Sequence, residues 1–258
     1  MNLSEIIKDA IVYPTNNIKA LVIYLVLGFL VGLVAALTGL GGFLTGSFNF
    51  AAGIVVGIIG IIVIICLLLL MLGFSLDIVK FWINEKYDAP EIELARQISN
   101  GVKYIIVSIV YLIIPIIVTV IMSMLNQTLG IVVGVILSII FSFALSMAIC
   151  RLAETDDLGH ALDIPGAFKD LQEIGIGKVV ITLIVSAIVG FVIVFILTLI
   201  LSAIVGIISA DLIYTAVPII TPIFDAWLLF YSNRVMGLLY SNKWLQILLF
   251  FNKKGIKH

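Results

Sequence analysis

Charged residues are scarce in this chain: they make up 11% of its 258 residues, whereas hydrophobic residues make up 63%. A soluble domain has about a quarter charged residues and about half apolar ones. The mean hydropathy of +1.31 therefore excludes an ordinary soluble domain. We also expect no nucleic-acid partner.

Cysteine and histidine are also scarce, with two of each. Cys66 and Cys150 both lie in apolar runs, where free cysteine behaves as a small core residue. His160 stands in a polar stretch with no second histidine or cysteine beside it, too few ligands for a metal site. No nucleophile–base pair, phosphate loop or metalloprotease helix is found. We expect no cofactor, no metal, no catalytic residue and hence no enzyme.

Long uncharged runs occupy most of the chain instead. About 20 apolar residues in a helix cross the roughly 30 Å of hydrocarbon in a bilayer. The runs predict an all-α, polytopic membrane bundle of six transmembrane helices arranged as three hairpins. The expected spans are residues 18–38, 50–74, 104–125, 130–150, 179–209 and 212–231.

A short amphipathic segment precedes each expected hairpin, at residues 1–13, 88–103 and 163–178. Asp88 and Asp163 each begin an Asp-x-Pro motif, and Lys103 and Lys178 close the two segments at the same offset. Such segments are typical of helices that lie on the membrane surface. They favour repeat-like units of about 1–75, 76–150 and 151–240 within a single membrane domain, 1–258, although unrelated hairpins with amphipathic leads would look alike. A basic interfacial tail, 241–258, follows.

The positions of glycine and the length of the fifth span predict several local features. The glycine-rich residues 39–49 are expected to form a loop, because glycine tolerates positive φ. Gly28 and Gly32 form a GxxxG motif, which lets helices approach closely. The fifth span is longer than one straight crossing requires, so we expect tilt or a break near Gly190 or Ser202.

All 14 Lys and Arg residues lie on one side of the six-span arrangement. An excess of basic residues in short loops marks the cytoplasmic face. Both termini are therefore expected in the cytoplasm, and the protein in the plasma membrane. A five-span arrangement would export the basic tail.

Asp225 is the acid that falls within an expected span. An ionised carboxylate in hydrocarbon costs about 2.5–3.5 kcal/mol on insertion scales, so such residues suggest function. Pro218 and Pro222 precede it and could distort the helix, as in ion-binding broken helices. Alternatively, Asp225 bonds a Ser or Thr on a neighbouring helix or reaches the inner interface.

The polar segments also offer a surface for partners, because nearly all the polar residues face the expected cytoplasmic side. Anionic lipid headgroups, or a cytoplasmic or membrane protein, could bind there. The candidate interface residues are Asp88, Lys103, Arg151, Glu154, Asp163 and Lys178.

Several short motifs are similar to those of a known family. They are Gly73-Phe74, Pro90-Glu91, the GVK of residues 101–103, the RLAET of 151–155, the GHALD of 159–163 and the GLLY of 237–240. This set resembles the DUF4013 membrane proteins, which are found mainly in archaea. Two positions depart from the family pattern: Ala89 replaces a usual Leu, and Cys150 replaces the Ala before Arg151. The resemblance implies an uncharacterised integral membrane protein and adds no chemistry.

Two functions remain. The first is a non-catalytic membrane scaffold, a subunit or a lipid-interacting protein. The alternative is a small-solute or ion transporter or channel that uses Asp225. The sequence leaves the oligomeric state open.

The expected topology can be tested with single cysteines at Asp163 and Gly42 in a background without Cys66 and Cys150. We expect a membrane-impermeant thiol reagent to label the two positions from opposite sides. Labelling of both from one side would contradict the six-span arrangement.

Overall fold

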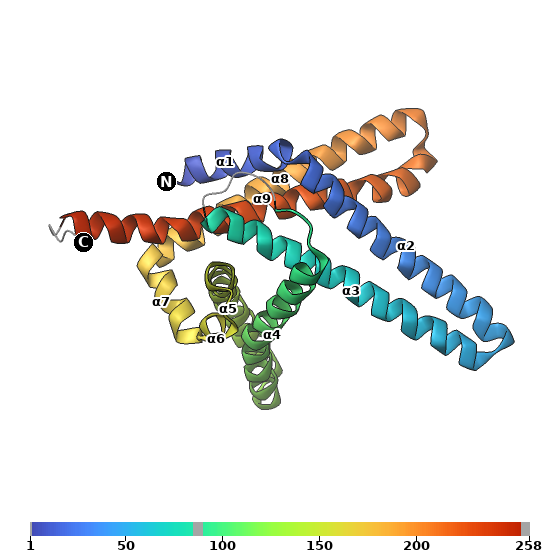
Figure 1. The fold of residues 1–258 in the computed structure, drawn as a ribbon, viewed down its shortest axis with the longest axis horizontal. Helices are drawn as coiled ribbons and strands as arrows, with labels where there is room; N and C mark the ends of the chain where they lie inside the picture. Colours follow the sequence, from blue (N-terminus) through green and yellow to red (C-terminus); the bar gives the residue numbers. More distant parts are fainter. Residues whose placement is uncertain (1, 85–89, 254–258) are drawn as a thin grey trace.

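The computed structural model describes residues 2–84 and 90–253 (Figure 1). Its helices are α1 (Leu3–Asn16), α2 (Ile18–Phe48), α3 (Phe50–Ile83), α4 (Leu94–Leu125), α5 (Gln127–Thr155), α6 (Leu158–Leu162), α7 (Ile164–Ile174), α8 (Ile176–Ile208) and α9 (Ala210–Lys253). Among the described residues, five helices are long and apolar enough to cross a membrane: α2, α3, α4, α5 and α8. The all-α fold is confirmed, and these helices suit a multi-pass membrane protein. The expected sixth span, 212–231, lies within α9, which is not among the five.

The long helices form antiparallel pairs: α2 with α3, α4 with α5, and α8 with α9 (Figure 1). Single residues, Asn49, Asn126 and Ser209, separate the two helices of each pair. The turns lie at the far ends of the pairs, and the pairs diverge from one another (Figure 1). At the opposite end α3, α5 and α9 meet pairwise. We call this meeting region the hub, formed by residues 70–82 of α3, 144–153 of α5 and 226–240 of α9.

Burial is concentrated in the hub rather than along the helix pairs. Phe74, Met147, Leu152, Tyr231 and Leu239 are each less than 2% exposed there. Within the most apolar window of each candidate span, only 6–22% of the residues are buried. The outer parts of the pairs therefore present apolar side chains outward, as lipid-facing helices do.

Two glycines allow α3 and α4 to pack closely beside the hub. A Cβ atom on Gly73 would lie 1.8 Å from the carbonyl oxygen of Gln97, and one on Gly101 would lie 2.1 Å from that of Leu69. Both distances are far inside van der Waals contact, so neither position admits a larger side chain without separating the helices. These glycines belong to the motifs at 73–74 and 101–103.

The expected glycine-rich loop at 39–49 is wrong, because α2 continues as helix to Phe48. Glycine is common in membrane helices, and a helix satisfies every backbone hydrogen bond where water is absent. Of the two expectations for the fifth span, tilt or a break near Gly190 or Ser202, the break is wrong and the tilt stays a prediction. Helix α8 is continuous, and at Gly190 it accommodates Leu228 and Tyr231 of α9.

The expected surface helix at 88–103 is wrong as a separate element. Asp88 and Ala89 lie outside the described residues, Pro90 to Glu93 are not helical, and α4 runs unbroken from Leu94 to Leu125. Arg96, Gln97 and Asn100 at its start bind Asp77 of α3.

The other two amphipathic segments form short helices. Helix α1 continues through Pro14 to Asn16, and Asn2 and Glu5 form a capping box at its start. Asp163 caps α7, as its position before Ile164 predicts. Lys178 does not close this helix, because α7 ends at Ile174, Gly175 follows with φ of 98°, and Lys178 lies inside α8.

The close contact of α3 and α4 can be tested with Gly73→Ala. We expect a loss of about 1–3 kcal/mol in stability, since a methyl group must displace the Gln97 carbonyl. The measurement is thermal unfolding of the purified protein in nanodiscs. Gly57→Ala in the same helix is the control, because a Cβ there meets nothing within 4 Å. Equal stability of the two variants would contradict the close packing.

Candidate functional site

An ion pair with at least one buried partner stands at each of three junctions in the hub. The first involves Asp77, near the end of α3, whose side chain is 2% exposed. Its carboxylate accepts hydrogen bonds from Asn100 Nδ2 at 2.7 Å and from Arg96 Nε at 3.2 Å. Both partners lie in the first two turns of α4. A buried carboxylate needs such partners, because desolvation of an unpaired charge is costly.

The second junction centres on Arg151 of α5. Its Nε donates to the carbonyl oxygen of His160 at 2.9 Å, and its terminal nitrogens reach Asp170 at 3.1 Å and Asp163 at 3.3 Å. Arg151 and Asp170 are both buried. The guanidinium thus holds α5, α6 and α7 together, using several donors of its planar fork.

Tyr240 of α9 joins this junction. Its hydroxyl lies 2.8 Å from Glu154 Oε2 and 3.4 Å from Asp170 Oδ2. Burial raises the pKa of Tyr240, and the hydrogen bond to Glu154 raises it further. Tyr240 therefore stays protonated at neutral pH and connects α9 to the acids of α5 and α7.

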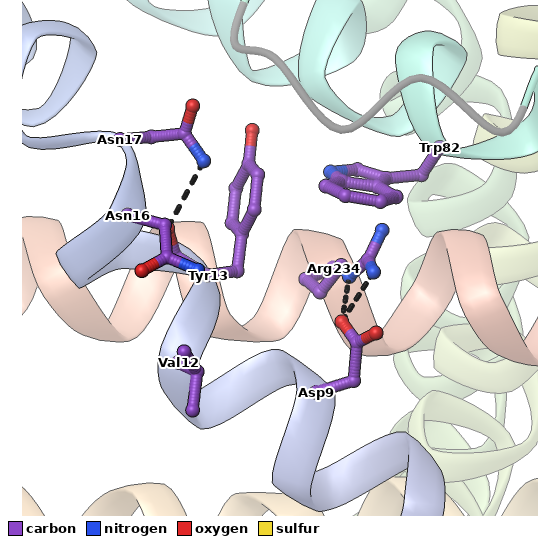
Figure 2. A pocket seen from close by; sticks show the side chains of 7 residues that line it. All are labelled: Asp9, Val12, Tyr13, Asn16, Asn17, Trp82 and Arg234. Carbon is purple, nitrogen blue, oxygen red and sulfur yellow. Dashed lines mark hydrogen bonds and ion pairs between the residues drawn. The ribbon is translucent and has the colours of Figure 1, made fainter.

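The third junction joins the two ends of the chain (Figure 2). Arg234 of α9 is 2% exposed and forms an ion pair with Asp9 of α1. The ring of Trp82 from α3 covers the guanidinium. Tyr13 stands beside it, edge-on to Trp82, with ring centroids 4.7 Å apart. A cavity of about 340 Å³ opens among these side chains and Asn17.

The three junctions share a pattern. In each, a charged residue on the second helix of a pair binds an opposite charge on an amphipathic segment. The partners in Asp77–Arg96 and Arg151–Asp170 are both 19 residues apart, with the signs of the charges exchanged. In the third junction the partners are 225 residues apart.

Asp156 links the first two junctions across the surface of the hub. It adopts a left-handed conformation with φ of 58° at the end of α5. Its carboxylate lies 2.7 Å from Lys103 Nζ and 3.6 Å from Lys80 Nζ. Partial burial acts to raise the pKa of Asp156, but the two lysines outweigh it and hold the pKa below its usual value. Asp156 is thus ionised at neutral pH.

A family model described as a protein of unknown function, DUF4013, matches residues 56–202. The chain belongs to the DUF4013 family. No match was found among curated proteins or among solved structures. The DUF4013 match includes the junctions of Asp77 and Arg151 and both glycines of the α3–α4 contact. Asp9, Asp225, Arg234 and Tyr240 lie beyond it.

The candidate interface residues fall in different places. Arg151 is buried, and Glu154 is partly buried against Tyr240. Asp163 is exposed at the start of α7, Lys103 binds Asp156, and Lys178 is half-buried in α8. Asp88 lies outside the described residues. Arg151 thus holds together segments of its own chain, and partner binding by the others stays a prediction.

Asp225 lines a different site, a groove between α2, α3 and α9. The groove has a volume of about 810 Å³, and Tyr24 and Asp225 are the polar residues in its described lining. Gly28 and Gly32 lie opposite Asp225 on α2. They mark no close helix contact: a Cβ on Gly32 would meet nothing within 4 Å. Pro222 also lines the groove, whereas the side chain of Pro218 is outside the described part.

Within residues 2–84 and 90–253, no group of three His, Cys, Asp or Glu side chains is placed to hold a metal ion. His160 faces Arg151 instead, with Nδ1 3.2 Å from a guanidinium nitrogen. In that geometry Nδ1 accepts the hydrogen bond, since arginine has only donors. The arrangement suits a structural role for His160.

Sequence reasoning missed Asp9, Asp77, Asp170 and Arg234 as a set. The sequence does carry one signal: Asp77 and Arg96 are 19 residues apart, and so are Arg151 and Asp170. The exchange of charges concealed it. For Asp9 and Arg234 the sequence offers no comparable signal.

The Arg151 junction can be tested with Arg151→Gln. We expect a loss of about 3–5 kcal/mol in stability, because Asp170 is left buried without its counter-ion. The control is Lys169→Gln, which removes a positive charge from an exposed pair with Glu173 on α7 and should cost less than about 1 kcal/mol. Thermal unfolding in nanodiscs measures both. Similar losses in the two variants would show that Arg151 is not a structural centre.

Proposed function

We propose that this protein is a non-catalytic membrane scaffold that binds anionic lipid headgroups on its cytoplasmic face. In this proposal α9 supplies a sixth span at about 212–231, the helix pairs are three membrane hairpins of repeated origin, and both termini are cytoplasmic. The protein resides in the plasma membrane.

The observation that carries the proposal is the placement of the core. The buried residues and the three ion pairs lie at one end, whereas the outer parts of the helix pairs expose their apolar faces. A protein that moves hydrophilic solutes requires polar groups along a path through the membrane. Here the three ion pairs hold the polar ends of the helices together, and the outer parts of the helix pairs face lipid.

The three junctions support the repeated origin and the common orientation. Each connects the end of one hairpin to the amphipathic segment that leads another, and the amphipathic segment of the first hairpin meets the end of the last. The charged ends of α1, α3, α4, α5, α7 and α9 therefore all lie on the same side, as the distribution of Lys and Arg requires.

Two lysines are suited to lipid headgroups. Lys8 on α1 and Lys19 at the start of α2 are exposed, close to where the first expected span enters the membrane. A basic residue near an anionic membrane surface contributes about 1 kcal/mol of attraction.

The proposal can be tested by extracting the protein into native nanodiscs and measuring the co-extracted lipids by mass spectrometry. We expect enrichment of anionic lipid over the bulk membrane, and loss of that enrichment in a Lys8→Gln/Lys19→Gln variant. The control, Lys8→Arg/Lys19→Arg, keeps both charges and should keep the enrichment.

The same protein in proteoliposomes should show no ion or solute flux above that of protein-free vesicles. A flux that disappears in Asp225→Asn would overturn the proposal in favour of a small-solute or ion transporter. Unchanged lipid enrichment in the Lys→Gln variant would show that these two lysines do not recognise headgroups.

A further inference from the structure

The groove beside Asp225 has the dimensions of a ligand site. Its volume of about 810 Å³ falls within the roughly 300–1,000 Å³ typical of small-molecule pockets. On α2 its lining extends from Tyr24 to Leu33, and on α9 from Pro222 to Leu229. At 1.5 Å per residue the groove is thus about 10–14 Å long, parallel to both helices.

The groove opens sideways rather than into the hub. On its rim, Phe29 is 69% exposed and Ile223 is 43% exposed, and both belong to the lipid-facing surfaces of their helices. Gly28 and Gly32 create the hollow in α2, since they carry no side chain that could fill it. A molecule dissolved in the bilayer could therefore enter directly from the lipid.

Asp225 places one carboxylate in this otherwise mainly apolar groove. Nine residues separate it from Arg234, about 13 Å along α9, too far for a direct ion pair. Its carboxylate has no hydrogen bond or ion pair within the described part of the chain. A charged group at membrane depth is stabilised when an opposite charge accompanies it.

Aromatic rings close the hub end of the groove. Tyr24 lines it and packs against Phe74 and Phe230, with ring centroids 6.3 Å and 5.9 Å away. These contacts fix the Tyr24 ring. The face of a tyrosine ring attracts cations, and the attraction is stronger where water is excluded.

We propose that the groove binds lipophilic organic cations, with Asp225 as the counter-ion and the walls from α2 and α9 holding the apolar body. Because Asp225 lies midway along the α9 wall, the ligand carries its charge amid apolar substituents rather than at one end. This binding site is independent of the scaffold role and of the lysines that recognise headgroups.

The test compares two ions of the same shape and opposite charge, tetraphenylphosphonium and tetraphenylborate. Binding to the full chain in phosphatidylcholine nanodiscs is measured by equilibrium dialysis, with protein-free nanodiscs as the baseline. We expect saturable binding of the phosphonium at one site per protein and no saturable binding of the borate.

Three variants locate the site. Asp225→Asn should weaken phosphonium binding at least about tenfold, because it removes the charge and keeps the shape. Gly32→Leu should abolish binding by filling the groove. Gly39→Leu is the matched control on the same helix, outside the groove and also with open space around it, and it should bind as the wild type does. Thermal unfolding of each variant verifies the fold.

The proposal fails if Asp225→Asn binds the phosphonium as tightly as the wild type, or if the borate binds equally well at the same site. It also fails if neither ion binds saturably while Gly32→Leu loses a phospholipid that the wild type retains. In that last case the groove holds an acyl chain.

Discussion

Paired charges inside the hub are the constraint on which the rest of the structure depends. Asp77, Arg151 and Arg234 lie where water is largely excluded, and each is tolerable there only because another segment supplies its counter-charge. Removal of one partner leaves an uncompensated charge, so the junctions specify which segments meet. Apolar helices in lipid lack such specificity, because lipid tails solvate their surfaces as well as a neighbouring helix does.

This division explains the shape of the molecule. The polar ends converge because their charges and hydrogen bonds require particular partners, whereas the hairpins diverge and keep their apolar faces outward (Figure 1). The groove at Asp225 lies between these regions, where α2 leaves α9. There Gly28 and Gly32 leave the α2 wall without side chains at those positions, and Tyr24, packed against Phe74 and Phe230 of the hub, closes one end.

The long helices could be predicted because hydrocarbon forces the backbone to satisfy its own hydrogen bonds, whatever the side chains. The same backbone requirement explains why the loop expected at 39–49 and the break expected near Gly190 are not found: glycine is helical at both places. The start of α4 was misread because its polar stripe faces Asp77 instead of water. The sequence singles out Asp225 as an acid within an expected span. Predicting the groove also requires the knowledge that α2 lies beside α9, and no local sequence pattern carries that information. The pairing of Asp9 with Arg234 is likewise non-local.

The pairing of α1 with α9 also sets an order of events during synthesis. Arg234 leaves the ribosome 225 residues after Asp9. At about 5–20 residues per second, α1 waits more than about ten seconds for its partner. The α8–α9 pair therefore completes the hub, because Arg234 follows both its counter-charge Asp9 and the covering Trp82 in the chain.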